Sequence, residues 1–176
     1  MKYVLSFLLV LAGVGASPAL AQRHIKNYNS AALSYGESEK GKVVELSYGR
    51  YVTNRLVLRG AVLGERGNAA TGYRVGQLSA HLAPQVLRFG EWFYLHGLAG
   101  VVGRYEWTEL DRPAEEGDGK TPQRVTFGPE LGAEADIFLH NRLSLIGSAR
   151  KARLFNDSRL DTWPGTYTVG LRLHIH

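Results

Sequence analysis

The sequence contains no cysteine among its 176 residues and only one methionine. The absence of cysteine excludes a disulfide framework, a cysteine metal cluster and a thiol nucleophile. The excess of one charge sign over the other is also small. The 21 Lys and Arg exceed the 16 Asp and Glu by a net +5, which is too little to indicate the clustered basic surface of a nucleic-acid-binding protein. No direct contact with nucleic acid is therefore expected.

Motifs for catalysis and for cofactor binding are missing as well. The sequence has no nucleophile elbow, phosphate loop, dinucleotide fingerprint or zinc-binding helix motif. His174 and His176 lie two residues apart and could share a face, but a chance pair near a chain end explains them better than a metal site. The acidic stretch 109–122 could bind a cation or a partner, but a solvated loop is the better interpretation. We therefore expect a protein that is not an enzyme, with no catalytic residue, no cofactor and no metal.

The N-terminal residues have the pattern of a secretory signal peptide. Lys2 supplies a positive charge, residues 4–14 form an apolar run too short to span a membrane, and Ala19-Leu20-Ala21 matches the small-residue cleavage pattern. We interpret residues 1–21 as a signal peptide and residues 22–176 as the single mature domain. Such a protein functions outside the cytoplasm.

The mature chain shows apolar alternation with a period of two and no sustained helical period. In residues 124–139, for example, Val125, Phe127 and Leu131 share one face, while Thr126 and Glu130 share the other. This pattern predicts an all-β protein. The predicted strands are residues 30–37, 42–52, 56–65, 72–87, 92–107, 123–139, 143–155 and 165–175.

Short and long connections alternate along these segments. The short ones are 53–55, 88–91 and 140–142, and the longer ones are 38–41, 66–71, 109–122 and 156–164. An even number of strands with short turns at one end and long loops at the other is typical of an up-and-down barrel inserted from the periplasm. Two of the short turns also share a spacing. Val52 and Leu56, like Leu139 and Leu143, lie four residues apart, as in a hairpin with a bulged turn.

The apolar face could line the core of a soluble, lipocalin-like barrel or contact lipid. The opposite face is rich in Gly, Ser and Thr and carries few charges, unlike the water-exposed face of a soluble barrel. The predicted strands are also long enough to cross a bilayer at a tilt. Aromatic residues fall near both strand ends, with Phe93 by a short turn and Tyr105, Trp107, Phe127 and Tyr167 by the long loops. We therefore predict an eight-stranded antiparallel transmembrane β-barrel in the lipid of a Gram-negative outer membrane.

An eight-stranded barrel is just wide enough for its own side chains, so its interior should be filled. Charged residues on the inward face are then expected to pair, because an unpaired buried charge costs several kcal/mol. The expected members are the acids Glu45, Glu130, Glu134 and Asp136 and the bases Arg59, Arg104, Arg150 and Arg172. We expect this network to be structural; a path for protons or solutes is the alternative.

Three further expectations concern particular inward or backbone positions. The turn at 140–142 sets a register in which Arg150 lies diagonal to both Glu130 and Glu134. His81 and His96 should face the interior on adjacent strands and form hydrogen bonds there. Pro129 lies within a strand of a closed barrel, where no edge can spare an N–H donor, so we expect a β-bulge at that residue.

Parts of the chain resemble the TraO-type conjugative-transposon transfer proteins of Bacteroidetes. The resemblance is carried by Ala-Gln-Arg at 21–23, by QLSAHLAPQVLRFGEWFYLHGLAGVVGRYEW at 77–107 and by FLHNRLSLIGSARKARLFNDSRLDTWPGTYTVGLRLHIH at 138–176. It implies an outer-membrane component of a conjugative DNA-transfer apparatus with other apparatus proteins as partners, and it supplies no residue-level site. The chain departs from common barrel proteins in ending Leu173-His174-Ile175-His176 instead of with an aromatic residue.

Two other functions are compatible with the same strands. A generic small outer-membrane barrel could serve adhesion or envelope stability through its polar loops. A lipid-modifying enzyme would need a positioned His, Ser or acid near the outer interface, and the sequence offers no such set.

Overall fold

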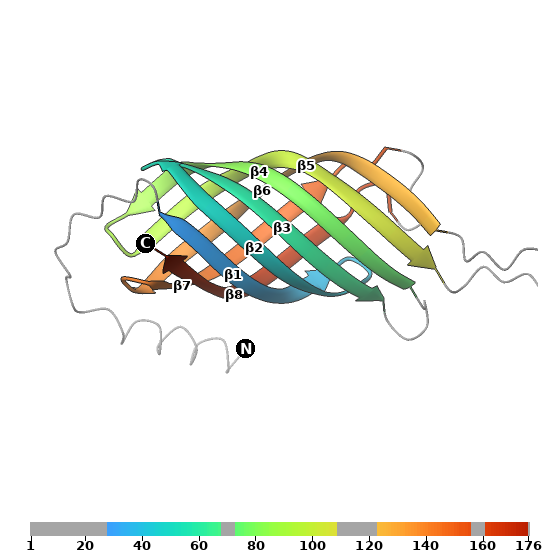
Figure 1. The fold of residues 1–176 in the computed structure, drawn as a ribbon, viewed down its shortest axis with the longest axis horizontal. Coiled ribbons are helices and arrows are strands. Elements are labelled where there is room, and N and C mark those ends of the chain that lie inside the picture. Colours follow the sequence, from blue (N-terminus) through green and yellow to red (C-terminus); the bar gives the residue numbers. More distant parts are fainter. Residues whose placement is uncertain (1–27, 68–72, 109–122, 156–160, 176) are drawn as a thin grey trace, which may run out of the picture.

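The computed structural model describes residues 28–67, 73–108, 123–155 and 161–175, and these residues form a closed antiparallel β-barrel (Figure 1). Each strand pairs with its neighbours in the sequence, and β1 pairs with β8 to close the barrel. The strands are β1 Asn29–Ser38, β2 Gly41–Thr53, β3 Leu56–Gly67, β4 Tyr73–Phe89, β5 Phe93–Thr108, β6 Gln123–His140, β7 Leu143–Ala152 and β8 Gly165–Ile175. The predicted up-and-down barrel is thus confirmed. The predicted signal peptide 1–21 and the acidic stretch 109–122 lie outside the described residues.

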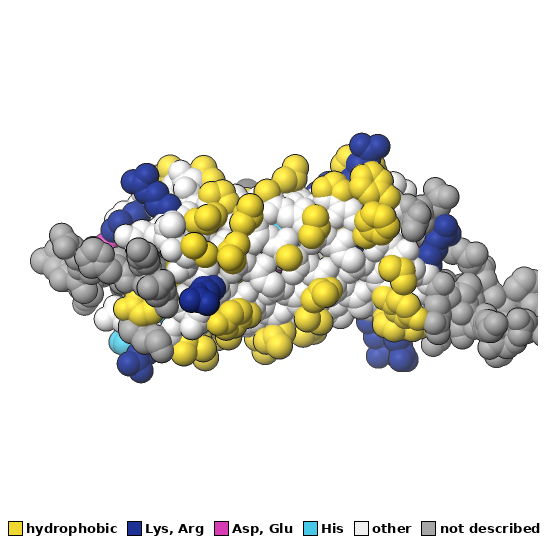
Figure 2. All heavy atoms as spheres, turned by 45° about the horizontal axis from the view of Figure 1, so that its top comes forward, with side chains coloured by type: hydrophobic (Ala, Val, Ile, Leu, Met, Phe, Trp, Pro, Cys, Tyr) yellow, Lys and Arg dark blue, Asp and Glu magenta, His cyan; other side chains and the backbone are white. Residues whose placement is uncertain are grey.

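Burial alternates along most of each strand, because successive side chains of a strand point to opposite faces. In β2, Val43 and Glu45 are at most 1% exposed, whereas Val44 and Leu46 are 52% and 60% exposed. Apolar side chains form a band around the outside of the barrel, with the cations nearer its two ends (Figure 2). A contiguous apolar surface of this kind marks a face that contacts something other than water.

Among the residues that the structure describes, no helix is long and apolar enough to cross a membrane.

Both predicted bulged turns are present. The register shifts between Tyr51 and Thr53 and between Phe138 and His140, so that Val52 and Leu139 are the extra residues. A third shift, which the sequence did not predict, places Val86 as an extra residue in β4. All three extra residues are apolar and exposed on the outside. Each bulge therefore adds an apolar side chain to the outer face close to a short turn.

The prediction of a bulge at Pro129 is wrong. Pro129 pairs in register with Val101 of β5, without a shift. The carbonyl of Pro129 accepts a hydrogen bond from the N–H of Arg153, so the missing donor of Pro129 faces the β7 side and not β5. Regular β7 ends at Ala152, three residues before the predicted end, and pairing resumes only as an isolated bridge between Phe127 and Phe155. Pro129 thus coincides with the early end of β7 and introduces no β-bulge in β6.

Aromatic side chains gather at both ends of the outer face. At the short-turn end, the rings of Phe89 and Trp92 both lie 5.8 Å from that of Phe93. Trp92, the first residue of the predicted strand 92–107, instead belongs to the turn and is 58% exposed. At the long-loop end, the rings of Tyr105 and Trp107 are 4.2 Å apart, edge to face.

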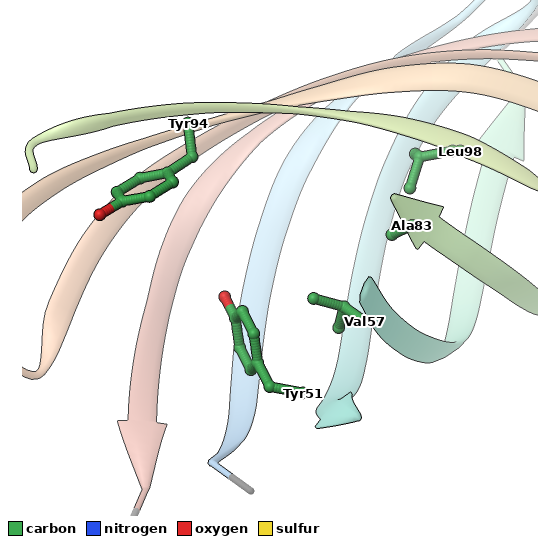
Figure 3. Packing of buried hydrophobic residues seen from close by; sticks show 5 residues of the cluster. All are labelled: Tyr51, Val57, Ala83, Tyr94 and Leu98. Carbon is green, nitrogen blue, oxygen red and sulfur yellow. The ribbon is translucent and has the colours of Figure 1, made fainter. Parts of the chain in front are cut away.

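The short-turn end of the interior is filled by apolar side chains. The residues, which we call the apolar plug, are Tyr51, Val57, Ala83, Tyr94 and Leu98 (Figure 3). Phe138 packs against the plug with its ring 5.3 Å from that of Tyr94. Further from the short turns, the interior becomes polar and charged.

Candidate functional site in the barrel interior

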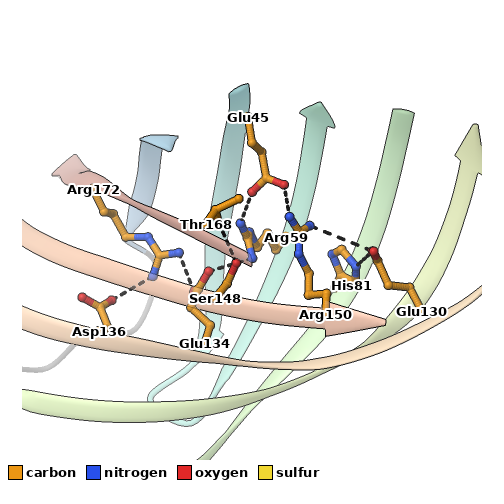
Figure 4. A network of polar contacts seen from close by, with 10 residues as sticks. All are labelled: Glu45, Arg59, His81, Glu130, Glu134, Asp136, Ser148, Arg150, Thr168 and Arg172. Carbon is orange, nitrogen blue, oxygen red and sulfur yellow. Dashed lines mark hydrogen bonds and ion pairs between the residues drawn. The ribbon is translucent and has the colours of Figure 1, made fainter. Parts of the chain in front are cut away.

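The predicted interior charges come from six different strands and all point inward. Because each occupies the inward phase of its strand, all are between 0% and 5% exposed. They are Glu45 of β2, Arg59 of β3, Arg104 of β5, Glu130, Glu134 and Asp136 of β6, Arg150 of β7 and Arg172 of β8. We call these residues the interior network (Figure 4, which omits Arg104).

Glu45 holds the centre of the interior network. Its Oε1 accepts a hydrogen bond from Nη2 of Arg59 at 2.5 Å, and its Oε2 accepts one from Arg150. Arg59 also reaches Glu134, with Nη1 2.7 Å from Oε2. Since β3 and β6, like β2 and β7, are three strands apart in the barrel, these ion pairs cross the interior and connect strands that are not neighbours.

Arg172 binds two carboxylates on the short-turn side of this centre. Its Nη2 lies 2.5 Å from Oε1 of Glu134, and its Nη1 lies 2.8 Å from Oδ2 of Asp136. Ser144 and His174 form a further contact there at 3.0 Å. Glu134 therefore joins Arg172 to Arg59 and makes one continuous chain of alternating charges.

Arg104 pairs with carboxylates that the sequence analysis missed. Its Nη2 lies 2.7 Å from Oε2 of Glu65, and its Nε lies 3.7 Å from Oε1 of Glu106. Glu65 also accepts hydrogen bonds from the hydroxyls of Tyr73, at 2.7 Å, and Ser38. A signal was present, because Glu65 has the same phase as Arg59 in β3, and Glu106 follows Arg104 by two residues.

The two interior histidines lie on adjacent strands. Nε2 of His81 is 2.6 Å from Oε2 of Glu130, and the ring of His96 is buried. Arg150 is paired across the strands with Gly132, which places it diagonal to Glu130 and Glu134. Of these two carboxylates, Glu130 is the one within ion-pair range of Arg150, at 4.0 Å.

This arrangement holds the charged side chains in place and fills the middle of the barrel interior. Glu45, Thr126, Asp136 and Ser144 are each 0% exposed, so water-sized molecules do not reach them. Buried charges are tolerable only when paired, and removing one partner of a buried pair costs about 3–5 kcal/mol. In the described ranges, no group of three or more His, Asp or Glu side chains is placed to hold a metal ion. The ion pairs of the interior network thus connect non-neighbouring strands across the barrel interior.

No protein-family model and no curated protein matches the chain. Several solved structures share its fold. The N-terminal β-barrel domain of OprF from Pseudomonas aeruginosa has a TM-score of 0.67 at 9% identity, with 85% of this chain and 98% of that domain covered. Neisserial surface protein A has a TM-score of 0.65 at 12% identity, with 83% and 95% covered. Ail, the attachment invasion locus protein of Yersinia pestis, has a TM-score of 0.55 at 17% identity, with 85% and 99% covered.

These similarities define the class of fold. The chain has the closed eight-stranded antiparallel architecture of small outer-membrane β-barrels.

Proposed function

We propose that residues 22–176 form an outer-membrane β-barrel without enzymatic activity, exported by a cleaved signal peptide at 1–21, that serves a conjugative DNA-transfer apparatus. The observation that carries the membrane placement is the pairing of an apolar outside with a charged, fully buried interior. A soluble barrel has the reverse arrangement, because its apolar face packs inward and its charges face water.

Lipid is accordingly the first partner of the protein. Strands of 10 to 18 residues reach or exceed the roughly 9–11 residues that a tilted strand needs to cross a bilayer. The interior network favours a structural barrel over a conducting one, since Glu45, Arg59 and Arg150 fill the middle of the interior with paired charges. The protein would act through its surfaces and not through a pore.

Membrane placement is tested by fractionating cells that express the full chain. We expect the protein in the outer-membrane fraction, with an electrophoretic mobility that changes when the sample is boiled, as closed barrels show. A protein that stays monomeric and folded in buffer without detergent would overturn the placement and the transfer role that depends on it.

The transfer role is supported by the resemblance of residues 77–107 and 138–176 to TraO-type proteins. Other proteins of the transfer apparatus would then be its partners, with the long-loop end or the outer face as contact surface. Deletion of the gene from a donor strain is expected to lower transfer frequency, and re-expression should restore it. Normal transfer by the deletion strain would refute the role while leaving the membrane placement intact.

Adhesion is the second candidate function. It is favoured by the shared fold with Ail, which is named as an attachment protein. At the long-loop end, β5 and β6 extend beyond the other strands (Figure 1). Comparing the attachment of expressing and non-expressing cells to a host-cell layer separates this candidate from the transfer role.

A further inference from the structure

Three cations stand side by side on the outer face at the long-loop end of β2, β3 and β4. Lys42 is paired in register with Arg66, and Arg66 with Arg74. All three side chains are exposed and have the outward phase of their strands. We call Lys42, Arg66 and Arg74 the basic row. The same row continues to Glu37 of β1 and to Trp107 of β5.

The basic row is only partly neutralised. Lys42 forms an exposed ion pair with Glu37. Arg66 and Arg74 make no ion pair with a carboxylate in the described part of the chain. Like charges directly opposite each other on antiparallel strands are destabilising. An anion bound between the two guanidinium groups would remove this repulsion.

Two glycines lie directly beneath the two arginines of the basic row. The next outward residues toward the middle of the barrel are Val44, Gly64, Gly76 and Tyr105, which are paired in register with one another. A Cβ added to Gly64 would meet no atom within 4 Å, and one added to Gly76 would lie 3.4 Å from the indole of Trp107. The backbone beneath Arg66 is thus open at Gly64, while the indole of Trp107 lies over the backbone of Gly76.

The apolar band begins below these glycines. Leu46, Val62 and Leu78 form the following outward row and are 58% to 65% exposed. Tyr105 and Trp107 lie beside the basic row, and aromatic side chains of this kind favour the headgroup level of a membrane. The order from the long loops inward is therefore cations, a row with two glycines between Val44 and Tyr105, and hydrocarbon-like surface. An anionic lipid has the same order of phosphate, glycerol or sugar, and acyl chain.

We propose that the basic row binds the phosphate of an anionic lipid headgroup in the leaflet on the long-loop side. Arg66 and Arg74 donate hydrogen bonds to the phosphate oxygens, because the guanidinium fork matches phosphate geometry. The acyl chains then lie along the apolar band. A lipid fits better than a nucleic acid because the cations share one outward face with the apolar band, at headgroup height. This inference rests on the membrane placement proposed above.

Quenching of tryptophan fluorescence by brominated lipid tests the proposal. In the full-length protein with Trp92→Phe and Trp163→Phe, Trp107 beside the basic row is the only tryptophan. The protein is reconstituted in phosphatidylcholine vesicles that contain brominated phosphatidylcholine or brominated phosphatidylglycerol. The ratio of the two quenching curves gives the preference for the anionic lipid. We expect a clear preference, which high salt weakens by screening.

Arg66→Gln with Arg74→Gln should remove most of this preference. One cation near an anionic surface is worth about fivefold in association, so the double variant should lose roughly thirtyfold at low salt. The matched control is Arg50→Gln with Lys151→Gln, which removes the same charge. Both control cations face outward, but neither has another cation opposite it in register, and Lys151 is 3.6 Å from Glu39. The control should keep the preference.

Equal losses in both double variants would overturn the proposal, because the preference would then follow total charge. The proposal would also be overturned if the protein that keeps both arginines showed no preference for the anionic lipid. This outcome does not depend on whether the double variant folds. Binding of a single-stranded oligonucleotide that Arg66→Gln and Arg74→Gln abolish, without any lipid preference, would assign the row to nucleic acid and also refute it. Failure of brominated phosphatidylcholine itself to quench Trp107 would contradict the membrane placement, and with it the proposal.

Discussion

The interior of the barrel is filled by two different means at two levels. At the short-turn end, the side chains of Tyr51, Tyr94 and Leu98 belong to the apolar plug. In the middle, the interior network joins strands that are not neighbours, as Glu45 of β2 does with Arg150 of β7. Apolar packing loses stability in proportion to the contacts removed, whereas a buried ion pair loses most when only one partner is removed. The two regions should therefore respond differently to single and to concerted substitutions.

The largest effect is expected from Glu45→Ala. It leaves Arg59 without one of its two carboxylates and Arg150 without its closest one, inside a region closed to water. The free energy of unfolding, measured by urea titration in lipid vesicles, should fall by about 3–5 kcal/mol. Glu37→Gln is the matched control, since it removes the partner of Lys42 in an exposed pair and should cost at most about 1 kcal/mol. Similar losses for both variants would mean that the interior charges are solvated.

A smaller loss is expected from Leu98→Ala in the apolar plug. The substitution leaves a cavity among side chains that need no polar partner, and it should lower the free energy of unfolding by about 2–3 kcal/mol. Leu46→Ala on the outer face removes the same atoms from a side chain that is 60% exposed and should cost less in the same titration. If the outer substitution proved the costlier one, the assignment of inside and outside would be wrong.

The smallest net effect is expected when the centre of the network is replaced as a unit. Glu45→Leu, Arg59→Met, Glu130→Gln and Arg150→Met together remove two cations and two anions, and Glu134, which loses Arg59, keeps its ion pair with Arg172. The quadruple variant should unfold within about 1 kcal/mol of the parent or be more stable, because replacing a buried ion-pair set as a unit avoids its desolvation cost. A loss as large as that of Glu45→Ala would show that the charges themselves, and not their mutual pairing, are required.

The sequence predicted the fold well because a period of two is a strong signal in long strands. It set the inward phase of Glu45, Arg59 and Arg172, and it predicted the bulges at Val52 and Leu139 from apolar residues flanking polar turns. It gave no sign of the bulge at Val86, since that residue lies inside a continuous strand.

Partner choice across the interior was less predictable. Alternation tells which face a side chain occupies but not which strand lies opposite at the same height. The contacts of Arg59 with Glu134 and of Arg104 with Glu65 depend on the curvature and stagger of the closed barrel. The prediction of a β-bulge at Pro129 was wrong for a related reason. Which neighbouring strand faces the missing N–H donor depends on the hydrogen-bond register.

The contact between the apolar band and lipid is tested most directly by a spin label on the outer face. The chain has no cysteine, so Leu131→Cys provides a unique attachment site at a position that is 65% exposed in the middle of β6, and Glu91→Cys provides one in a short turn. In vesicles, the label at residue 131 should collide more often with oxygen than with a water-soluble nickel complex, and the label at residue 91 should show the opposite. Greater access of the nickel complex at both positions would contradict the account.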